Sequence, residues 1–340
     1  MSQGQAATAP PRVSLAEGTR FERLDSHTYK IHLHSDFCIG AVPNGGYTAS
    51  CMLAAANAHL GSRGQPDTFT AHFEFTNKTA AGPGIIVIDE VKLGRQVSTL
   101  HLTLWQGDIL DHAPWFVASS SRRKVLAYTT QVDLKVSTGP SFPTGYQGTS
   151  AAAMPATPDF DLVKKKGTDG KWKDASRPSN PLSKGSLGNW DMLIPSQGAL
   201  TPGVCDVWIS AVGGQRITQA TLPYVVDAFP FDVLAFFTPP GYFSPDDPEA
   251  LAKRSKARRG LWFPTVLLNL EIKKLLPEQG VEWLNMSITT KQIKDGRLDI
   301  EVMVRDLAGE LVALSSQVSM ILSMDRNTSK TGSWQKKAAL

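Results

Sequence analysis

The strongest constraint on the fold is a pattern of one helix followed by four strands, which occurs twice along the chain. The first copy occupies residues 15–136 and the second occupies residues 201–325, with the elements at similar spacing in both. Repetition of this kind indicates an internal duplication. Because an antiparallel sheet wrapped around one buried helix satisfies the layer rules of α+β domains, each copy is expected to form such a unit.

Two periodicities identify the elements of the first copy. Residues 29–34 are expected to form a strand, and residues 43–46 (PNGG) are expected to form a turn. Residues 47–60 are small and apolar on nearly every side, which predicts a helix that is buried all round. Apolar and polar residues alternate in 68–75 and in 100–104, which is typical of half-buried antiparallel strands.

The second copy repeats this order. Residues 227–237 predict the helix, and residues 264–270 and 283–289 predict two strands. Leucine, isoleucine and valine recur at every second position over 298–304, alternating with Asp299, Glu301 and Met303, and residues 311–321 complete the set. The two copies together predict two helix-wrapped sheets that join side by side.

The segment between the copies, residues 137–200, has a different composition. Eight of the 22 prolines lie between positions 140 and 202, and Ser, Thr, Gly and Lys are frequent. Since periodicity is absent, the segment is interpreted as a linker or a surface excursion. Residues 137–191 are expected to lack regular core-forming structure.

Composition limits the compartment and the partners of this chain of 340 residues. The net charge of +4 is too small and too diffuse to indicate a nucleic-acid partner, but it suits an anionic small ligand. Cys38, Cys51 and Cys205 form neither a disulfide framework nor a metal-binding pattern, so a reducing compartment is expected. No apolar stretch is long enough to span a membrane. The cytoplasm is the expected location; the peroxisome is the alternative, although the final residues lack its usual signal.

Several enzyme classes are excluded by missing motifs. The chain has no G-x-S-x-G, H-E-x-x-H, P-loop or G-x-G-x-x-G sequence. All seven histidines precede Ala113, so the second copy contains none. Histidine-dependent chemistry in the second copy would therefore require a histidine from the first.

Six motifs occur in a fixed order along the two copies. They are VPNGGY (42–47), EVKLGRQVSTLHLTLWQGD (90–108), YVVD (224–227), FPTVLLNLEIKK (263–274), VEWLNM (281–286) and GELVALSSQVSMIL (309–322). In this order and spacing they resemble the double-hotdog acyl-CoA thioesterase family of the thioesterase II type. Two departures mark a divergent member: Leu267 and Leu268 stand where the family often has Asp-His, and Val318-Ser319 follows Gln317 in place of Glu-Gly.

The resemblance implies a catalytic set of Asp227, Thr265 and Gln317, with no cofactor and no metal. A buried carboxylate of raised pKa can deprotonate a water, while a hydroxyl and an amide hold that water over a thioester carbonyl. Taken singly, each residue has a simpler interpretation. Asp227 would be a helix N-cap, Thr265 an ordinary strand residue, and Gln317 a residue on the solvent face of a strand.

Substrate contacts are expected from both copies. Asn44, Gly45, Gly46 and Tyr47 would line the entrance, although the glycine pair could equally be a simple turn that needs positive φ. Residues 253–259 (KRSKARR) include Arg254, Arg258 and Arg259, which suit the phosphates of CoA. The alternative for this run is a solvated charged loop.

The first copy is expected to lack a second active site. Residues 44–46 hold no carboxylate to match Asp227, and residues 119–121 are all serine where a match to Gln317 is expected. Thr68 or Thr70 would match Thr265. One competent site per pair of copies follows, with the first copy as a wall and a glycine-lined entrance.

Three functions remain open from the sequence. The leading hypothesis is hydrolysis of acyl-CoA or acyl-carrier thioesters. The second is a hotdog dehydratase or hydratase, which usually requires a histidine beside an acid. The third is a non-catalytic or biosynthetic protein that binds an acyl or polyketide-like ligand, which the apolar pair Leu267 and Leu268 would favour. A homo-oligomer is left open.

Overall fold

The computed structural model describes residues 12–136, 138–149, 152–175, 185–238 and 259–328. The first half contains one long helix and a set of antiparallel strands. Its elements are α1 (Leu15–Gly18), β1 (Phe21–Arg23), β2 (Thr28–Leu33), β3 (Cys38–Ile39), β4 (Val42–Pro43), α2 (Gly45–Gly61), β5 (Asp67–Phe75), β6 (Gly82–Lys92), β7 (Ser98–Gln106) and β8 (Arg122–Val132).

The second half has the same strand plan with shorter helices. Its elements are α3 (Phe160–Lys166), β9 (Trp172–Asp174), β10 (Trp190–Pro195), β11 (Val204–Ala211), α4 (Leu222–Val226), α5 (Leu234–Phe237), β12 (Leu261–Trp262), β13 (Thr265–Ile272), β14 (Trp283–Thr289), β15 (Ile293–Lys294), β16 (Arg297–Arg305), β17 (Leu311–Met320), β18 (Leu322–Ser323) and α7 (Asp325–Thr328).

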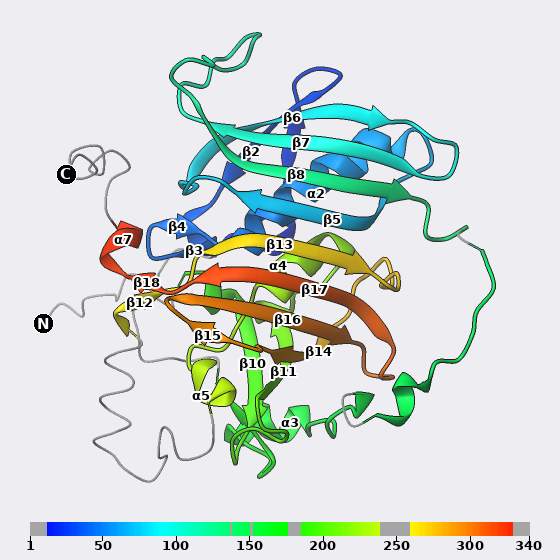
Figure 1. The fold of residues 1–340 in the computed structure, drawn as a ribbon, viewed down its shortest axis with the longest axis vertical. Helices are drawn as coiled ribbons and strands as arrows, with labels where there is room; N and C mark the ends of the chain where they lie inside the picture. The colour runs from blue at the N-terminus through cyan, green and yellow to red at the C-terminus, as the bar shows by residue number, and fades with distance from the viewer. Residues whose placement is uncertain (1–11, 137, 150–151, 176–184, 239–258, 329–340) are drawn as a thin grey trace, which may run out of the picture.

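Fourteen strands of the described residues form one continuous antiparallel sheet. Each half orders its strands in the same way, as β2-β6-β7-β8-β5 and as β11-β14-β16-β17-β13. The halves join where β5 pairs with β13, and there a side-chain hydrogen bond links His72 to Asn269 at 2.7 Å. Figure 1 shows the strands of both halves side by side, with α2 and α4 behind them. The predicted α+β double hotdog is confirmed.

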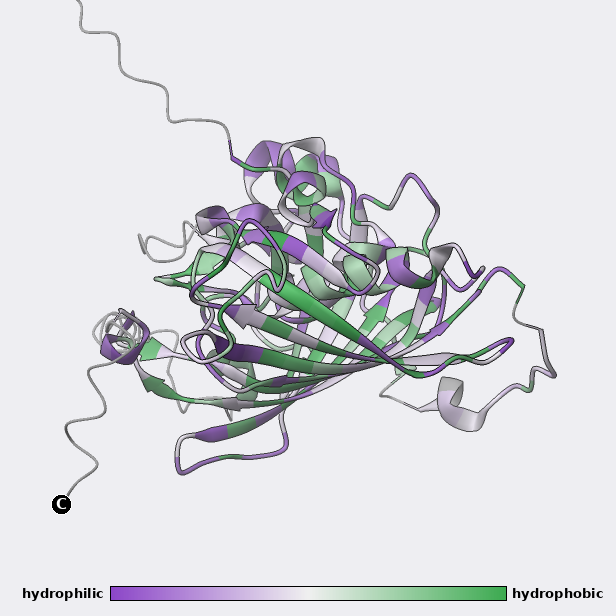
Figure 2. Ribbon diagram, turned by 90° about the horizontal axis from the view of Figure 1, so that it is seen from above, coloured by the Kyte–Doolittle hydropathy of each residue, from purple (hydrophilic) through white to green (hydrophobic). Residues whose placement is uncertain are grey.

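The core lies between the sheet and its helices. Residues of α2 such as Ala49, Met52 and Leu60 have no exposed surface, as the all-round apolar pattern predicts. Along the strands, hydrophobic and hydrophilic residues form alternating bands (Figure 2), which is the period of two read from the sequence. No described helix is long and apolar enough to cross a membrane.

The prediction of one helix over residues 227–237 is wrong. Helix α4 ends at Val226, Asp227 follows as its C-cap, and helical structure resumes only in α5. Pro230 lacks an N–H and disfavours the helical conformation of the residue before it, so a continuous helix cannot pass this point. Asp227 therefore ends a helix, and its interpretation as an N-cap is also wrong.

The expectation that residues 137–191 lack core-forming structure is wrong for much of the described part. Strands β9 and β10 extend the sheet beyond β11. Trp172 and Trp190 are 2% and 1% exposed, and Trp172 packs in a small cluster with Val163 and Trp208. Large aromatic side chains supply burial that average composition does not reveal. The domain boundaries themselves stay a prediction.

Candidate active site

A carboxylate from the second half is held by residues of both halves. Asp227 is 6% exposed and directly follows α4. Its Oδ2 accepts a hydrogen bond from the Gly46 backbone N–H at 2.8 Å, and its Oδ1 accepts one from the Thr265 hydroxyl at 3.0 Å. The side-chain amide of Asn44 donates to the Asp227 carbonyl at 3.2 Å. Asp227 therefore lies between the first turn of α2 and the start of β13.

The two glycines of the first half allow this close approach. A Cβ on Gly46 would lie 2.2 Å from the Pro223 carbonyl oxygen and 2.6 Å from the Asp227 Cβ. A Cβ on Gly45 would lie 3.2 Å from Asp227 Oδ2. Neither glycine has a positive φ, and Gly45 is already the first residue of α2. The simple-turn interpretation is therefore wrong, because the glycines provide space and not an unusual backbone conformation.

The surroundings of Asp227 tune its acidity. Burial raises the pKa of its carboxyl from 3.8 to about 6, while hydrogen bonds from Gly46, Thr265 and Asn44 act in the opposite direction. The N-terminal end of α2 also favours a negative charge here. The carboxyl is thus ionised near neutral pH, yet it can accept a proton at small cost, as a general base requires.

Gln317 lies on β17, next to the backbone that carries Asp227. It is 2% exposed, so its interpretation as a residue on a solvent face is wrong. Its Nε2 donates to the Val226 carbonyl at 2.8 Å and to the Ser315 hydroxyl at 3.4 Å. Its Oε1 is buried without a hydrogen-bond partner among the described residues. Gln317 therefore fixes the residue before Asp227 and retains an unused acceptor.

Asp227 and Thr265 open onto a cavity of about 440 Å³, a size suited to a small molecule. Asn44 and Gly45 line it as well. Its walls are mainly apolar and aromatic, and three basic residues complete the lining. The main contributors are Phe75, Phe229, Phe231, Trp262, Phe263, Leu298, Ile300, Met320 and Met324, with Lys78, Arg259 and Arg326 as the basic residues.

The other residues singled out from the sequence lie elsewhere. Tyr47 is fully buried and donates its hydroxyl hydrogen to the Gly18 carbonyl at 2.7 Å. It does not line the cavity, so this geometry gives no support to its expected contact with substrate, which stays a prediction. Leu267 and Leu268 do not line the cavity either, which removes the observation that favoured a non-catalytic protein. Arg254 and Arg258 lie outside the described residues.

Sequence reasoning missed several cavity residues. Phe229 and Phe231 lie two and four positions after Asp227, where a continuous helix was expected. Lys78 follows β5, and Arg326 lies in α7 at the far end of the chain; the Lys78 ammonium donates to the Arg326 carbonyl at 2.8 Å. The alternation of Phe and Pro over residues 229–231 was a usable signal of extended backbone. No local pattern could bring Lys78 and Arg326 together.

The strand registers correct the expected counterparts of the site in the first half. Both β5 with β8 and β13 with β17 carry an irregularity directly after the first paired threonine, which aligns Thr68 with Thr265. By the same registers, Thr129 of the first half is the counterpart of Gln317 of the second half. The expectation that residues 119–121 hold this counterpart is therefore wrong. Gln131 donates to the hydroxyls of both Thr68 and Thr129, at 3.2 and 3.1 Å. These positions form a hydroxyl–amide network without a carboxylate.

Comparison with known proteins gives matches along most of the chain. A family model of the acyl-CoA thioesterase N-terminal domain matches residues 33–123, and a model of the acyl-CoA thioesterase C-terminal domain matches residues 161–321. The thioesterase-like protein TwmA of Talaromyces wortmannii is 51% identical over 351 residues, covering all of both chains. The ustilagic acid biosynthesis cluster protein orf2 of Mycosarcoma maydis is 28% identical over 112 residues, 27% of this chain and 29% of that protein.

Solved structures support the fold. A putative thioesterase II from Thermobifida fusca has a TM-score of 0.65 at 19% identity and covers 92% of this chain and 98% of its own. A protein with a hot dog fold from Alicyclobacillus acidocaldarius has a TM-score of 0.62 at 16% identity and covers 91% and 97%. At these identities the likeness establishes the architecture.

Proposed function

Because the chain belongs to the acyl-CoA thioesterase family, we propose that it hydrolyses an acyl thioester with Asp227 as the general base. One observation carries the proposal: a buried carboxylate of raised pKa opens onto an apolar cavity and is bound by the Gly46 N–H and the Thr265 hydroxyl. Such a carboxylate meets the requirements of a base that activates water near neutral pH.

The reaction follows from the contacts of these groups. Asp227 takes a proton from a water molecule as the water oxygen attacks the thioester carbonyl carbon. The carbon–sulfur bond then breaks, the acid is released, and the departing sulfur takes the proton from Asp227, which regenerates the base. Thr265 orients the carboxylate through Oδ1, and Gln317 holds the carbonyl of the preceding residue. Gln317 does not itself line the cavity, so contact between its unpaired, buried Oε1 and the attacking water stays a prediction.

As water attacks, negative charge develops on the thioester carbonyl oxygen, and a hydrogen-bond donor is needed to stabilise it. Gly45 is the first residue of α2 and lines the cavity, and no group among the described residues accepts a hydrogen bond from its backbone N–H. A helix N-terminus favours such a charge through its free N–H groups and its dipole. Gly45 is therefore the proposed oxyanion donor, supplied by the first half to a base in the second.

The cavity also suggests the substrate class. Its aromatic and aliphatic walls suit an acyl chain, and Arg259 and Arg326 are exposed, with Lys78 half-buried beside them. These cations suit the phosphates of CoA or of an acyl carrier. The contributions of Arg254 and Arg258 stay predictions. A dehydratase gains no support, because none of the seven histidines lines the cavity.

A thiol-release assay tests this function. Purified protein is incubated with acyl-CoA substrates from acetyl to palmitoyl, and free thiol is measured. Wild type should release thiol with at least one chain length, whereas Asp227→Asn should be slower by roughly 10²–10⁴ in kcat. Asp206→Asn is the matched control, since Asp206 is a second buried carboxylate and lies outside this cavity. Equal loss in both variants, or no thiol release by wild type, would contradict the proposal.

A further inference from the structure

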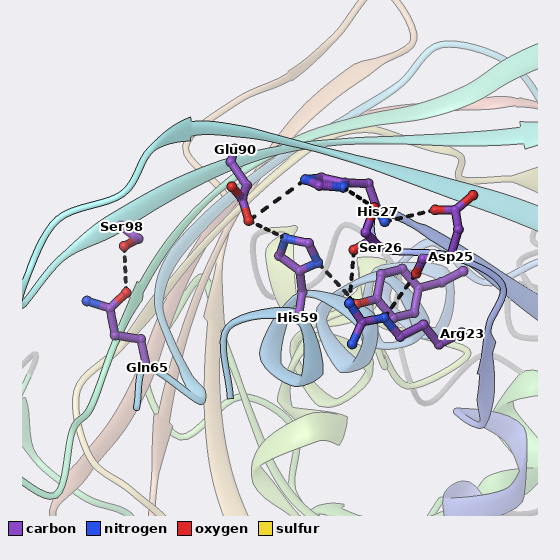
Figure 3. A network of polar contacts seen from close by, with 9 residues as sticks. Arg23, Asp25, Ser26, His27, His59, Gln65, Glu90 and Ser98 are labelled. Atoms are coloured by element: carbon purple, nitrogen blue, oxygen red, sulfur yellow. Dashed lines mark hydrogen bonds and ion pairs between the residues drawn. The ribbon is translucent and has the colours of Figure 1, made fainter. Parts of the chain in front are cut away.

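Two histidines and one glutamate converge at the end of α2 opposite to the candidate active site. His27 lies in the turn before β2, His59 in the last turn of α2, and Glu90 on β6. The Nε2 of His59 lies 3.0 Å from Glu90 Oε1, and the Nε2 of His27 lies 3.9 Å from the same oxygen. Figure 3 shows both imidazole rings directed at this carboxylate.

Each imidazole ring has a hydroxyl partner on its other nitrogen. The Nδ1 of His27 lies 2.8 Å from the Ser26 Oγ, and the Nδ1 of His59 lies 3.1 Å from the hydroxyl of buried Tyr29. When each Nδ1 donates its proton to its hydroxyl, both Nε2 atoms present lone pairs toward Glu90. Outer partners of this kind set the tautomer and the ring orientation of histidine ligands.

The turn that carries His27 is fixed independently of these contacts. The Arg23 guanidinium donates to the carbonyls of Asp25 and Ser26, at 3.0 and 3.2 Å. The Asp25 carboxylate accepts the His27 backbone N–H at 2.9 Å and the Trp115 indole N–H at 2.7 Å. The backbone of His27 is therefore positioned before any ligand binds.

We propose that His27, His59 and Glu90 form a binding site for a divalent transition-metal ion, with Zn²⁺ as the best match. The three candidate ligand atoms lie within 4.8 Å of one another, and ligands of a tetrahedral zinc ion are roughly 3.4 Å apart. Only a small rotation of the half-exposed His27 ring is needed. Two imidazoles and one carboxylate are a zinc ligand set that leaves a fourth position for water.

The charges around the site favour a cation. Glu90 contributes a negative charge. Arg23 is the opposing positive charge, and its guanidinium is directed to the carbonyls of the turn. This proposal departs from the expectation from the sequence that no metal binds; the three residues are 31 or more positions apart and form no local metal-binding pattern.

A metal ion at this place would join three elements of the first half. It would tie the last turn of α2 to the turn before β2 and to the end of β6. The opposite end of α2 supplies the Gly46 N–H to Asp227. The proposed role is therefore to fix α2 between the sheet and the second half, which is separate from the chemistry of thioester cleavage.

Cobalt titration of the untagged full-length chain, after treatment with a chelator, tests the site. Co²⁺ should bind with a stoichiometry of one, give d–d absorption without a thiolate charge-transfer band, and be displaced by Zn²⁺. Both ions should raise the melting temperature. Glu90→Gln and His27→Ala should weaken binding by more than about 100-fold, and Tyr29→Phe by roughly 10–100-fold, as for the loss of an outer partner.

His101→Ala is the matched control. His101 also faces a carboxylate on the neighbouring strand, with Nδ1 3.2 Å from Asp89 Oδ2, but no second histidine joins that pair. Binding should be unchanged in this variant. The proposal is overturned if wild type binds no stoichiometric Co²⁺, if a thiolate band appears, or if His27→Ala binds as wild type does. Equal weakening in His101→Ala would also overturn it.

Discussion

Replacing Asp227 by asparagine should change how the stability of the protein depends on pH. The pKa of the carboxyl rises from 3.8 to about 6 on folding, mainly because the group is buried. Between these two pH values the native state binds a proton that the unfolded chain releases. The contribution of this carboxyl to the stability of the wild type should therefore fall as pH rises through this window, by about 3 kcal/mol in total.

Asparagine removes this dependence while keeping the contacts. Its carbonyl oxygen can accept from the Gly46 N–H, and its amide can donate to the Thr265 hydroxyl. Asp227→Asn should consequently gain stability relative to the wild type as pH rises from 4 to 8, with most of the gain below pH 7. Urea unfolding at pH 4, 5, 6, 7 and 8 measures the difference in the free energy of unfolding between the two proteins.

Asp169→Asn gives a control whose difference from the wild type should hardly change over this pH range. Slight burial of Asp169 is outweighed by backbone N–H donors, which lower the pKa of its carboxyl below 3.8. Its contribution to stability is therefore already present above the unfolded pKa and is lost only at lower pH, so the difference between Asp169→Asn and wild type should stay nearly constant from pH 4 to 8. A difference between Asp227→Asn and wild type that stays constant from pH 4 to 8 would refute the reasoning on burial of the carboxylate.

Three further predictions concern packing, catalysis and binding. Gly46→Ala should destabilise the protein by more than about 2 kcal/mol in thermal unfolding, because the added Cβ would collide with the Pro223 carbonyl oxygen. Gly61→Ala on the same helix adds a Cβ in open space and should change stability little. Equal effects of the two substitutions would contradict this prediction. Thr265→Ala and Gln317→Ala should each lower kcat less than the loss of the base does, and steady-state kinetics of the double variant should show losses smaller than their product if both act on one water. Arg259→Ala should raise KM for acyl-CoA without changing kcat, and should leave an uncharged N-acetylcysteamine thioester unaffected; a KM effect on both substrates would assign the residue another role.

The strands and the long first helix could be predicted because their signals are local. In β5, β7 and β16 the alternation of apolar and polar residues indicates which side chains face the core, and it can be read from consecutive residues. The all-apolar surface of α2 reports burial in the same way. Asp227 and Thr265 could be selected only through the order of the motifs, since each residue alone has a simpler structural interpretation.

The errors arose where the decisive contact is not local. A helix was expected over residues 227–237, although Pro230 disfavours the helical conformation of Phe229, the residue before it. Trp172 and Trp190 are buried in the described part of the proline-rich segment because Trp172 packs with Trp208 and Trp190 packs against Tyr224. The convergence of His59 and Glu90 depends on where α2 ends against the sheet, which no sequence spacing reveals.

The pH dependence of thioester hydrolysis by the wild type and by Asp227→Asn tests the central claim most directly. If Asp227 is the base, kcat/KM of the wild type should decline on the acid side with a pKa of about 6, since protonation of the carboxyl removes the base. Asp227→Asn should retain only a small residual rate without this acid limb. Full hydrolysis by Asp227→Asn, or the same acid limb in its profile, would contradict the account.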